Sequence, residues 1–186
     1  MRPMNVYDFD NTIFHGDSTV RLLFYAFAHV PASLRTLPSV VWNGALYILR
    51  LQSKRRFKEK VYAFCGYVPD MDSFLKGFWN KNLGRIYKWY LDGKKDDDII
   101  ISASSEFALR PACSMLGVRL IATEVDPHSG KYLSENCHGE EKLRRFREQY
   151  PSAEIDEFYS DSRSDAPLAM QAKKAYFVRR GKAIDW

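Results

Sequence analysis

Asn5-Val-Tyr-Asp-Phe-Asp-Asn-Thr12 is the stretch that decides the fold. It predicts a short buried strand over Asn5–Asp10 that ends in carboxylates, followed by a polar loop that begins at Asn11. Residues two apart in an extended strand face the same side, so we expect Asp8 and Asp10 to point together. Two such carboxylates repel one another, and an oxygen-preferring divalent ion such as Mg²⁺ would relieve the repulsion. Taken alone, the motif is equally compatible with carboxylates that only cap the next turn.

The rest of the chain alternates between helical and strand patterns after one long helical segment. From Ser18 to Leu91 apolar and aromatic residues recur three and four apart, which predicts helices throughout. Ile99–Ser102 is a continuous apolar run, typical of a strand buried on both faces of a parallel sheet. Further elements are expected in the order helix, strand, helix, strand, helix, strand: Glu106–Leu116, Val118–Ala122, Lys142–Gln149, Glu157–Ser160, Pro167–Ala172 and Ala175–Val178.

This alternation predicts the α/β class, with a Rossmann-like open parallel sheet and right-handed crossovers. We expect residues 1–17 and 92–186 to form the core and residues 18–91 to be an inserted all-helical subdomain. A length of 186 residues suits one domain with one such insertion.

Charge and cysteine content restrict the partners and the compartment. A formal net charge of +5 favours anionic ligands, but the basic residues lie in short scattered groups, so we expect no nucleic acid partner. The three cysteines form no CxxC pair, which suggests neither a disulfide framework nor a zinc site and fits a reducing cytoplasm. The first residues lack the apolar core of a signal peptide, so the expected location is cytoplasmic.

Two apolar runs, Leu22–Val30 and Ser39–Arg50, complicate the prediction of a soluble protein. Neither reaches the ~20 residues that a membrane span needs. Pro31 and Pro38 separate the runs, which favours two helices of a small bundle. Contact with a membrane surface stays an alternative that is not favoured.

Three further sets of polar or charged side chains are expected at the edge of the sheet that carries Asp8 and Asp10. Asp161-Ser-Arg-Ser-Asp165 follows an apolar strand and supplies a second set of carboxylates. Ser102 closes another strand and supplies a hydroxyl, and Lys142 opens a helix from which its ammonium can reach the edge. Acids, a hydroxyl, a lysine and a metal ion together indicate a phosphoryl-transfer site.

The motifs DFDNT (8–12), IIISASSE (99–106), GEEK (139–142) and YSDSRSD (159–165) resemble, in this order, the four motifs of the haloacid dehalogenase superfamily of phosphatases. The match spans nearly the whole chain. The helical region between the first two motifs resembles that superfamily's helical cap, and the motifs are similar to those of its phosphoserine phosphatase-like branch. The resemblance implies a magnesium-dependent phosphomonoester hydrolase that acts on a small-molecule phosphate ester.

The resemblance also implies catalytic roles. Asp8 would be the nucleophile that forms an aspartyl phosphate. Asp10 would be the general acid and then the base, a role that a raised pKa would suit. Thr12 would brace the nucleophile loop, while Ser102 and Lys142 bind the phosphoryl oxygens.

The implied metal site uses the same edge of the sheet. Mg²⁺ would be held by Asp8, Asp161 and the main-chain carbonyl of Asp10, with Asp165 supporting the shell. Many relatives carry glycines around the first acid of the fourth motif, where this chain has serines. Further candidates for phosphate binding or support are Asn11 and Ser104, although serines that end a loop or cap a helix are common.

The leaving group is left open by the sequence. The inner face of the cap should select it. Five aromatic residues are either core of the bundle or a pocket for an apolar or lipid group: Phe24, Tyr25, Phe27, Trp42 and Tyr47. The cap's candidates for a zwitterionic group such as serine phosphate are Arg21, Arg55, Arg56 and Glu59.

Three alternatives to the hydrolase stay open. A phosphotransferase would use the same residues with an acceptor alcohol in place of water. A phosphatidylglycerophosphate-type lipid phosphatase would work at the membrane surface. A non-catalytic metal- or phosphate-binding module would keep the fold without turnover, but it would not need acids at both Asp8 and Asp10.

Overall fold

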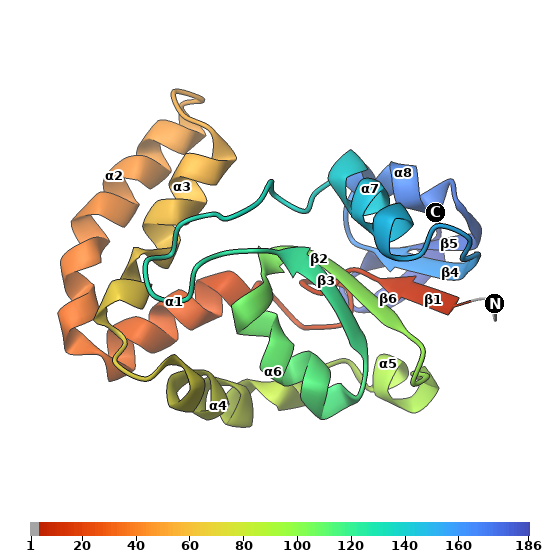
Figure 1. Ribbon diagram of the computed structural model, residues 1–186, viewed down its shortest axis with the longest axis horizontal. Coiled ribbons are helices and arrows are strands. Elements are labelled where there is room, and N and C mark those ends of the chain that lie inside the picture. Colours follow the sequence, from red (N-terminus) through yellow and green to blue (C-terminus); the bar gives the residue numbers. More distant parts are fainter. Residues whose placement is uncertain (1–3) are drawn as a thin grey trace.

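Six strands form a single sheet in the computed structural model, which describes residues 4–186 (Figure 1). The strands are β1 (Met4–Tyr7), β2 (Ile99–Ser105), β3 (Arg119–Thr123), β4 (Ile155–Ser160), β5 (Ala172–Arg179) and β6 (Lys182–Asp185). Their spatial order is β3-β2-β1-β4-β5-β6, and every neighbouring pair is parallel except β5 with β6. The expected α/β fold with a mostly parallel sheet is therefore confirmed. Residues 1–3 of the predicted core segment lie outside the described residues.

The centre of the sheet is also the point where its strand order reverses. After β1, the next two strands of the chain, β2 and then β3, lie on one side of it. The following strands, β4 and then β5, lie on the other side. All four residues of β1 are buried, as expected for a strand with helices on both faces. The carboxyl ends of β1, β2 and β4 therefore meet at a topological switch point, the usual place for a ligand site in such a sheet.

Helices cover both faces of the sheet (Figure 1). On one face lie α7 (Glu140–Gln149) and α8 (Ala166–Ala169), which bury Phe146 and Leu168 against the sheet. On the other face lies α6 (Glu106–Leu116), whose bounds match the predicted helix. Its Leu109 shares a second buried cluster with Tyr7 of β1.

The segment between β1 and β2 contains only helices, as its periodicity predicts. These are α1 (Ser18–His29), α2 (Leu37–Ile48), α3 (Lys54–Val61), α4 (Met71–Asn82) and α5 (Lys88–Gly93), with 3₁₀ turns at Pro31–Thr36, Tyr62–Tyr67 and Leu83–Arg85. Among the described residues, no helix combines the length and the apolar character needed to cross a membrane.

The helical segment does not pack uniformly against the sheet. In α4, Trp79 is fully buried, and its Nε1 donates to the carbonyl of Ala108 in α6 at 2.6 Å. The hairpin of α2 and α3 instead projects from the body of the molecule (Figure 1). The division into a core and a cap at residues 18 and 91 stays a prediction.

The C-terminal end departs from the sequence-based expectation. The helix predicted to reach Ala172 ends at Ala169, because Ala172 pairs with Ile155 of β4 and joins the sheet. Strand β6 is not anticipated by the sequence analysis, and it is antiparallel to β5. The turn between them, Arg180-Gly181, has φ values of 50° and 73°. Two positive φ values in a two-residue loop are typical of a tight hairpin.

Candidate active site

Asp8 directly follows β1 and is held from three sides. Its backbone N–H donates to the carbonyl of Tyr159 at 2.8 Å. Its Oδ1 accepts from Lys142 Nζ at 2.6 Å, and its Oδ2 accepts from Thr12 Oγ1 at 3.3 Å. Thr12 Oγ1 in turn accepts from the backbone N–H of Asp161 at 3.0 Å. Thr12 therefore ties the loop after β1 to the loop after β4, which is the bracing position predicted for it.

The loop after Asp8 is anchored by its apolar residues. Phe9 and Phe14 are fully buried, stack at 5.4 Å, and both pack edge-on against Trp79. The carbonyl of Phe9 accepts from the backbone N–H groups of residues 12, 13 and 14, which forms a tight turn. Asn11 sits in this turn with φ 57°, a conformation that asparagine tolerates better than most residues. The loop therefore presents its polar residues from a fixed base.

Lys142 bridges two buried carboxylates. It lies in the first turn of α7 with 2% exposure, and its Nζ lies 2.6 Å from Asp8 Oδ1 and 2.7 Å from Asp165 Oδ2. Burial alone would lower the pKa of Lys142, but the charges of Asp8 and Asp165 outweigh it and raise that pKa. Burial raises the pKa of Asp8, and the Lys142 ammonium opposes that effect. The lysine is thus a permanent positive charge beside Asp8 and Asp165.

Asp10 has a different environment from Asp8. Its Oδ1 accepts from the backbone N–H of Ser18 at 2.6 Å, and its Oδ2 accepts from Ser104 Oγ at 2.5 Å. Burial raises the pKa of Asp10 to about 7, and the charge of Asp17 adds to this effect. Asp10 can therefore hold a proton near neutral pH. Ser104, a candidate for phosphate binding, contacts this acid.

A cavity of about 230 Å³ lies at the edge of the sheet where these groups meet. Eight of the nine predicted site residues line it: Asp8, Asp10, Asn11, Ser102, Ser104, Lys142, Asp161 and Asp165. The ninth, Thr12, lies behind the cavity wall and is fully buried. Ser102 Oγ accepts from the backbone N–H of Ser104 at 3.1 Å, at the point where the pairing of β2 with β3 becomes irregular.

Sequence reasoning missed four ionisable residues of the cavity: Asp17, Lys54, Lys58 and His138. Lys58 Nζ donates to the carbonyl of Ala103 at 2.7 Å, and burial lowers its pKa to about 8, with the charge of Lys54 adding to the shift. His138 Nε2 lies 3.0 Å from Ser164 Oγ. Lys54 and Lys58 are four apart in α3, so their spacing indicates a shared face but not which face meets the site.

None of the candidate leaving-group residues of the helical segment 18–91 lines the cavity. Arg55 pairs with Glu59 at 3.6 Å and with Glu135 at 3.2 Å. None of the five aromatic candidates lines the cavity either. Phe24 and Trp42 are 64% and 66% exposed, so these two do not belong to a core.

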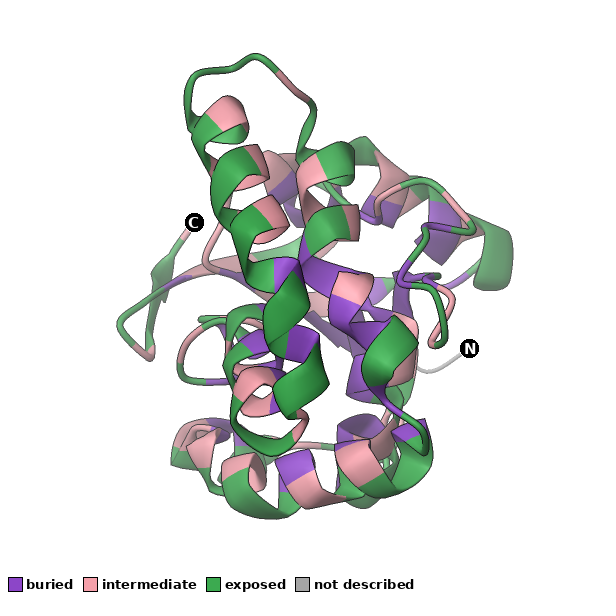
Figure 2. Ribbon diagram, turned by 90° about the vertical axis from the view of Figure 1, so that its left-hand side faces the viewer, coloured by how far each residue is buried: buried purple, intermediate pink, exposed green. Residues whose placement is uncertain are grey.

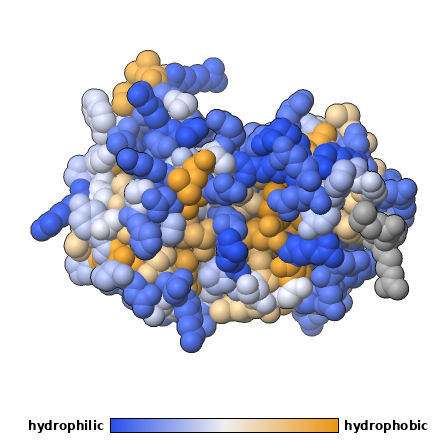
Figure 3. All heavy atoms as spheres, viewed as in Figure 1, coloured by the Kyte–Doolittle hydropathy of each residue, from blue (hydrophilic) through white to orange (hydrophobic). Residues whose placement is uncertain are grey.

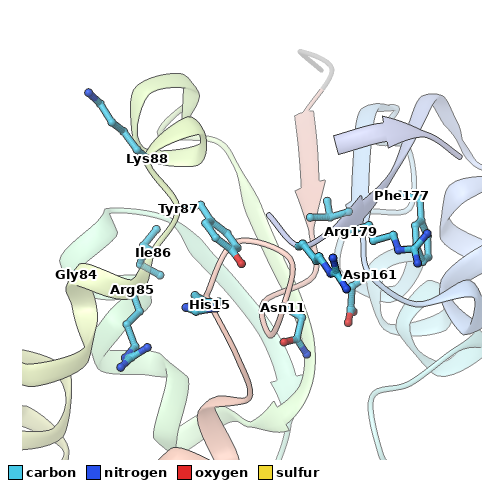
Figure 4. Close-up of a pocket in the computed structure, with 12 residues that line it drawn as sticks. Asn11, His15, Gly84, Arg85, Ile86, Tyr87, Lys88, Asp161, Phe177 and Arg179 are labelled. Carbon is cyan, nitrogen blue, oxygen red and sulfur yellow. The ribbon is translucent and has the colours of Figure 1, made fainter. Parts of the chain in front are cut away.

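A second and larger hollow, of about 1080 Å³, adjoins the first at Asn11 and Asp161, which line both (Figure 4). In Figure 4, His15 and Tyr87 lie on one side of it and Arg179 on the other. None of Asp8, Asp10 and Lys142 lines it. The chemistry therefore belongs to the smaller cavity.

The cavity residues fit a bound magnesium ion. In the part of the chain that the structure describes, no group of three or more His, Cys, Asp and Glu side chains is arranged to hold a metal by itself. Asp8 and Asp165 each use one carboxylate oxygen to accept a hydrogen bond from Lys142. However, Mg²⁺ usually takes only one or two carboxylates and completes its shell with water and substrate phosphate. Burial, with the charge of Asp8 adding to it, raises the pKa of Asp161 to about 6, and the buried Oδ1 of Asp165 has no hydrogen-bond partner. This unbalanced negative charge is what a divalent cation would relieve.

A lysine-bound carboxylate beside a second carboxylate that can hold a proton, at the switch point of a parallel sheet, is typical of enzymes that transfer phosphoryl groups. The profile of the haloacid dehalogenase-like hydrolase family matches residues 6–170. The chain belongs to this family. Among curated protein sequences, none gives a significant match to this chain.

Solved structures share the fold at low sequence identity. A Bordetella pertussis Tohama I protein of unknown function gives a TM-score of 0.74 at 20% identity, with 94% of this chain and 89% of that chain covered. A phosphoserine phosphohydrolase-like protein from Francisella tularensis subsp. tularensis SCHU S4 gives 0.57 at 18% identity, with 94% and 86% covered. A substrate-bound phosphoserine phosphatase gives 0.56 at 14% identity, with 94% and 85% covered. These similarities confirm the fold of the phosphoserine phosphatase-like branch.

Proposed function

We propose that the chain is a magnesium-dependent phosphomonoester hydrolase that works through an aspartyl phosphate on Asp8. One observation carries the proposal: the two carboxylates at the end of β1 have opposite charged neighbours. Burial raises the pKa of both, but Asp8 lies against the Lys142 ammonium at 2.6 Å, which opposes the rise, whereas the charge of Asp17 adds to the rise at Asp10, whose pKa is about 7. Carboxylates whose environments differ in this way suit a nucleophile and a general acid respectively.

In the first step, a carboxylate oxygen of Asp8 attacks phosphorus and the ester P–O bond breaks. Asp10 gives its proton to the departing alcohol oxygen, so the alcohol leaves neutral. The phosphoryl group is then bonded to Asp8. Lys142 and Ser102, which line the same cavity, would bind the phosphoryl oxygens as negative charge builds on them.

In the second step, Asp10 is ionised and takes a proton from a water molecule. The water oxygen attacks phosphorus, the bond between phosphorus and Asp8 breaks, and inorganic phosphate leaves. Both aspartates return to their starting states, so the cycle balances. Ser104 and the backbone of Ser18 keep Asp10 in place by hydrogen bonds of 2.5 and 2.6 Å.

The residues that would hold Mg²⁺ are Asp8, Asp161 and the main-chain carbonyl of Asp10, with Asp165 in support. When bound, the ion neutralises negative charge on the phosphate and lowers the pKa of the neighbouring carboxylates. Asp165 already accepts from Ser160 Oγ and Lys142 Nζ at 2.7 Å each, which suits a supporting position.

The proposed substrate class rests on two basic residues of the cavity. Lys54 and Lys58 of α3 line the cavity together with Asp10, and they belong to the helical segment 18–91 that we propose as the cap. Two ammonium groups favour a leaving group that carries a negative charge of its own. Small anionic phosphomonoesters are therefore the proposed substrates.

The test is phosphate release from a panel of phosphomonoesters with and without Mg²⁺, comparing the native chain with Asp8→Asn. Asp8→Asn keeps the shape of the side chain and removes its nucleophilic charge. Release that requires both Mg²⁺ and Asp8 supports the proposal. A folded native chain that hydrolyses no ester in the presence of Mg²⁺ would contradict it.

A further inference from the structure

Helix α2 presents its most apolar face to solvent. No residue of α2 is buried, although the helix is largely apolar. Its exposed positions recur with helical spacing and continue into the residue after it: Leu37, Pro38, Val41, Trp42, Ala45, Ile48 and Leu49. These seven residues are called the α2 apolar face. Figure 2 views this side of the molecule.

The exposure of this face is large at its centre and at its end. Val41 and Trp42 are 63% and 66% exposed, and Ile48 and Leu49 are 80% and 66% exposed. The adjoining loop adds Leu51, which is 70% exposed. In Figure 3, hydrophobic atoms gather at the tip of the projecting α2–α3 hairpin, with hydrophilic atoms beside them. Contiguous apolar surface of this kind indicates an interaction site.

The opposite side of α2 is the one that faces the protein, and it mixes apolar and polar residues. Val40 packs against the main core cluster, and Tyr47, which is 37% exposed, stacks on Phe57 of α3 at 5.3 Å. Gly44 allows Phe57 to approach closely. Asn43 on this side donates to the carbonyl of Ser39 at 2.8 Å. A helix that packs only within a water-soluble protein has the reverse arrangement, with its apolar stripe turned to the core. The α2 apolar face is therefore left without a partner among the described residues.

Positive charge is concentrated in the segment that carries the same face. Residues 31–60 contain seven Lys or Arg residues and one acidic residue, a net charge of +6, whereas the whole chain carries +5. Lys54 and Lys58 line the active-site cavity, and Arg55 pairs with Glu59 and Glu135. The remaining basic residues of the segment are exposed: Arg35, Arg50, Arg56 and Lys60.

We infer that the α2 apolar face docks on an anionic lipid membrane. An apolar helix face flanked by Lys and Arg is the surface that lies in the interface of a bilayer, with its basic groups on anionic headgroups. A second copy of the chain fits less well, because a symmetric contact through this face would bring two regions of charge +6 together. The inference does not depend on the reaction at Asp8.

The test is co-sedimentation with vesicles of phosphatidylcholine alone and with vesicles of phosphatidylcholine and phosphatidylglycerol in a ratio of about 2:1. We expect the native chain to bind only the anionic vesicles. The variant Val41→Ser/Ile48→Ser/Leu49→Ser should bind at least about tenfold more weakly, because it removes apolar area that the bilayer would bury. Arg50→Gln should bind about fivefold more weakly and lose part of the salt dependence.

The matched control is Leu133→Ser/Met170→Ser, which removes apolar residues of similar exposure, 68% and 75%, outside the hairpin. It should bind anionic vesicles as the native chain does. Circular dichroism and activity on a soluble ester show whether each variant is folded. All altered side chains are exposed and lie outside the active-site cavity, so the fold should persist.

Three outcomes would overturn the inference. The first is a native chain that binds neither kind of vesicle, and the second is a triple variant that binds as well as the native chain. The third is a native dimer, measured by light scattering, that the triple variant converts to monomers while vesicle binding is absent. In that case the α2 apolar face is covered by a second copy.

Discussion

Replacement of Lys142 by methionine should destabilise the folded chain more at neutral pH than at acidic pH. The change removes the ammonium that lies 2.6 Å from Asp8 and 2.7 Å from Asp165, and it keeps a long unbranched side chain. Lys142 is 2% exposed, and the two carboxylates are 8% and 1% exposed. Water therefore cannot replace the lost positive charge.

The size of the effect follows from the burial of the partners. Removal of one member of a buried ion pair costs about 3–5 kcal/mol, because a buried charge is left uncompensated. Here two carboxylates lose the same partner and repel one another, so we expect the free energy of unfolding to fall by about 4 kcal/mol at neutral pH. This is a large part of the ~5–15 kcal/mol that a domain usually has.

The dependence on pH has a defined sign. In the variant, Asp8 loses the ammonium that opposes its raised pKa, so burial holds the pKa of this carboxyl still further above its unfolded value. Groups with raised carboxyl pKa values favour the folded state when they are protonated, so their penalty is present at neutral pH and fades as pH falls towards about 4. The difference in stability between native chain and variant should shrink in the same range.

Urea denaturation followed by circular dichroism at several pH values measures this difference. The double variant Lys142→Met/Asp165→Asn is the control, because it leaves one buried carboxylate in place of two and should recover part of the loss. A deficit below about 1 kcal/mol, or one that does not change with pH, would show that the ion pairs of Lys142 are not formed in the folded chain.

Three further predictions concern the acid, the cap and the backbone. Because the protonated form of Asp10 is needed in the first step, kcat/KM should fall as pH rises through the pKa of Asp10, which burial raises to about 7 and which bound Mg²⁺ lowers from there. This falling limb should be missing from any residual activity of Asp10→Asn, and a native profile without it would contradict the assignment. Lys58→Met should raise KM for esters with an anionic leaving group more than for esters with a neutral one in steady-state assays, and equal effects on both would remove the lysine from substrate selection. Gly130→Ala should lower stability by more than ~3 kcal/mol, because at φ 71° its Cβ would lie 2.3 Å from the carbonyl oxygen of Tyr62. Gly117→Ala, at φ 69° with nothing within 4 Å, should lower stability by only ~1 kcal/mol, with both variants measured by thermal denaturation. Equal losses of stability in the two variants would mean that the contact with Tyr62 does not matter.

The sequence allowed the position of the site to be predicted because its residues lie at the ends of strands. Asp8 and Asp161 lie just beyond the carboxyl ends of β1 and β4, and a parallel sheet brings those ends to one edge. Ser102 is the last residue of the regular pairing of β2 with β3, although β2 continues to Ser105, three residues beyond the predicted strand. Lys142 opens a helix that packs on the same sheet. Topology alone therefore brings these four together.

The cap was harder to predict because helical periodicity does not say which neighbour a face meets. The spacing of Lys54 and Lys58 is as clear as that of Arg55 and Glu59, yet only the first pair enters the cavity. Trp42 lies on an apolar helix face that suggests a core position, but that face is turned to solvent. Sequence alone identifies a face that needs a partner, and the tertiary arrangement decides whether the chain supplies one.

The end of the chain was predicted only in part. Helix and strand patterns meet between Pro167 and Ala175, and pairing with β4 draws Ala172 into the sheet. The short strand β6 has four exposed residues, so it lacks the alternation of buried and exposed positions by which strands are recognised. Its best signal is the turn at Arg180-Gly181, where glycine accommodates one of the two positive φ values.

The most direct test of the account is the detection of a phosphoryl group on Asp8. The Asp10→Asn variant is mixed with Mg²⁺ and p-nitrophenyl phosphate, whose leaving group departs without protonation, and is quenched in acid for peptide mass spectrometry. We predict that the phosphoryl group accumulates on the peptide that contains Asp8, because the base for the second step is missing, and that Asp8→Asn/Asp10→Asn shows none. Release of nitrophenol with the phosphoryl group on another residue, or with no phosphorylated chain at any time of quenching, would contradict the account.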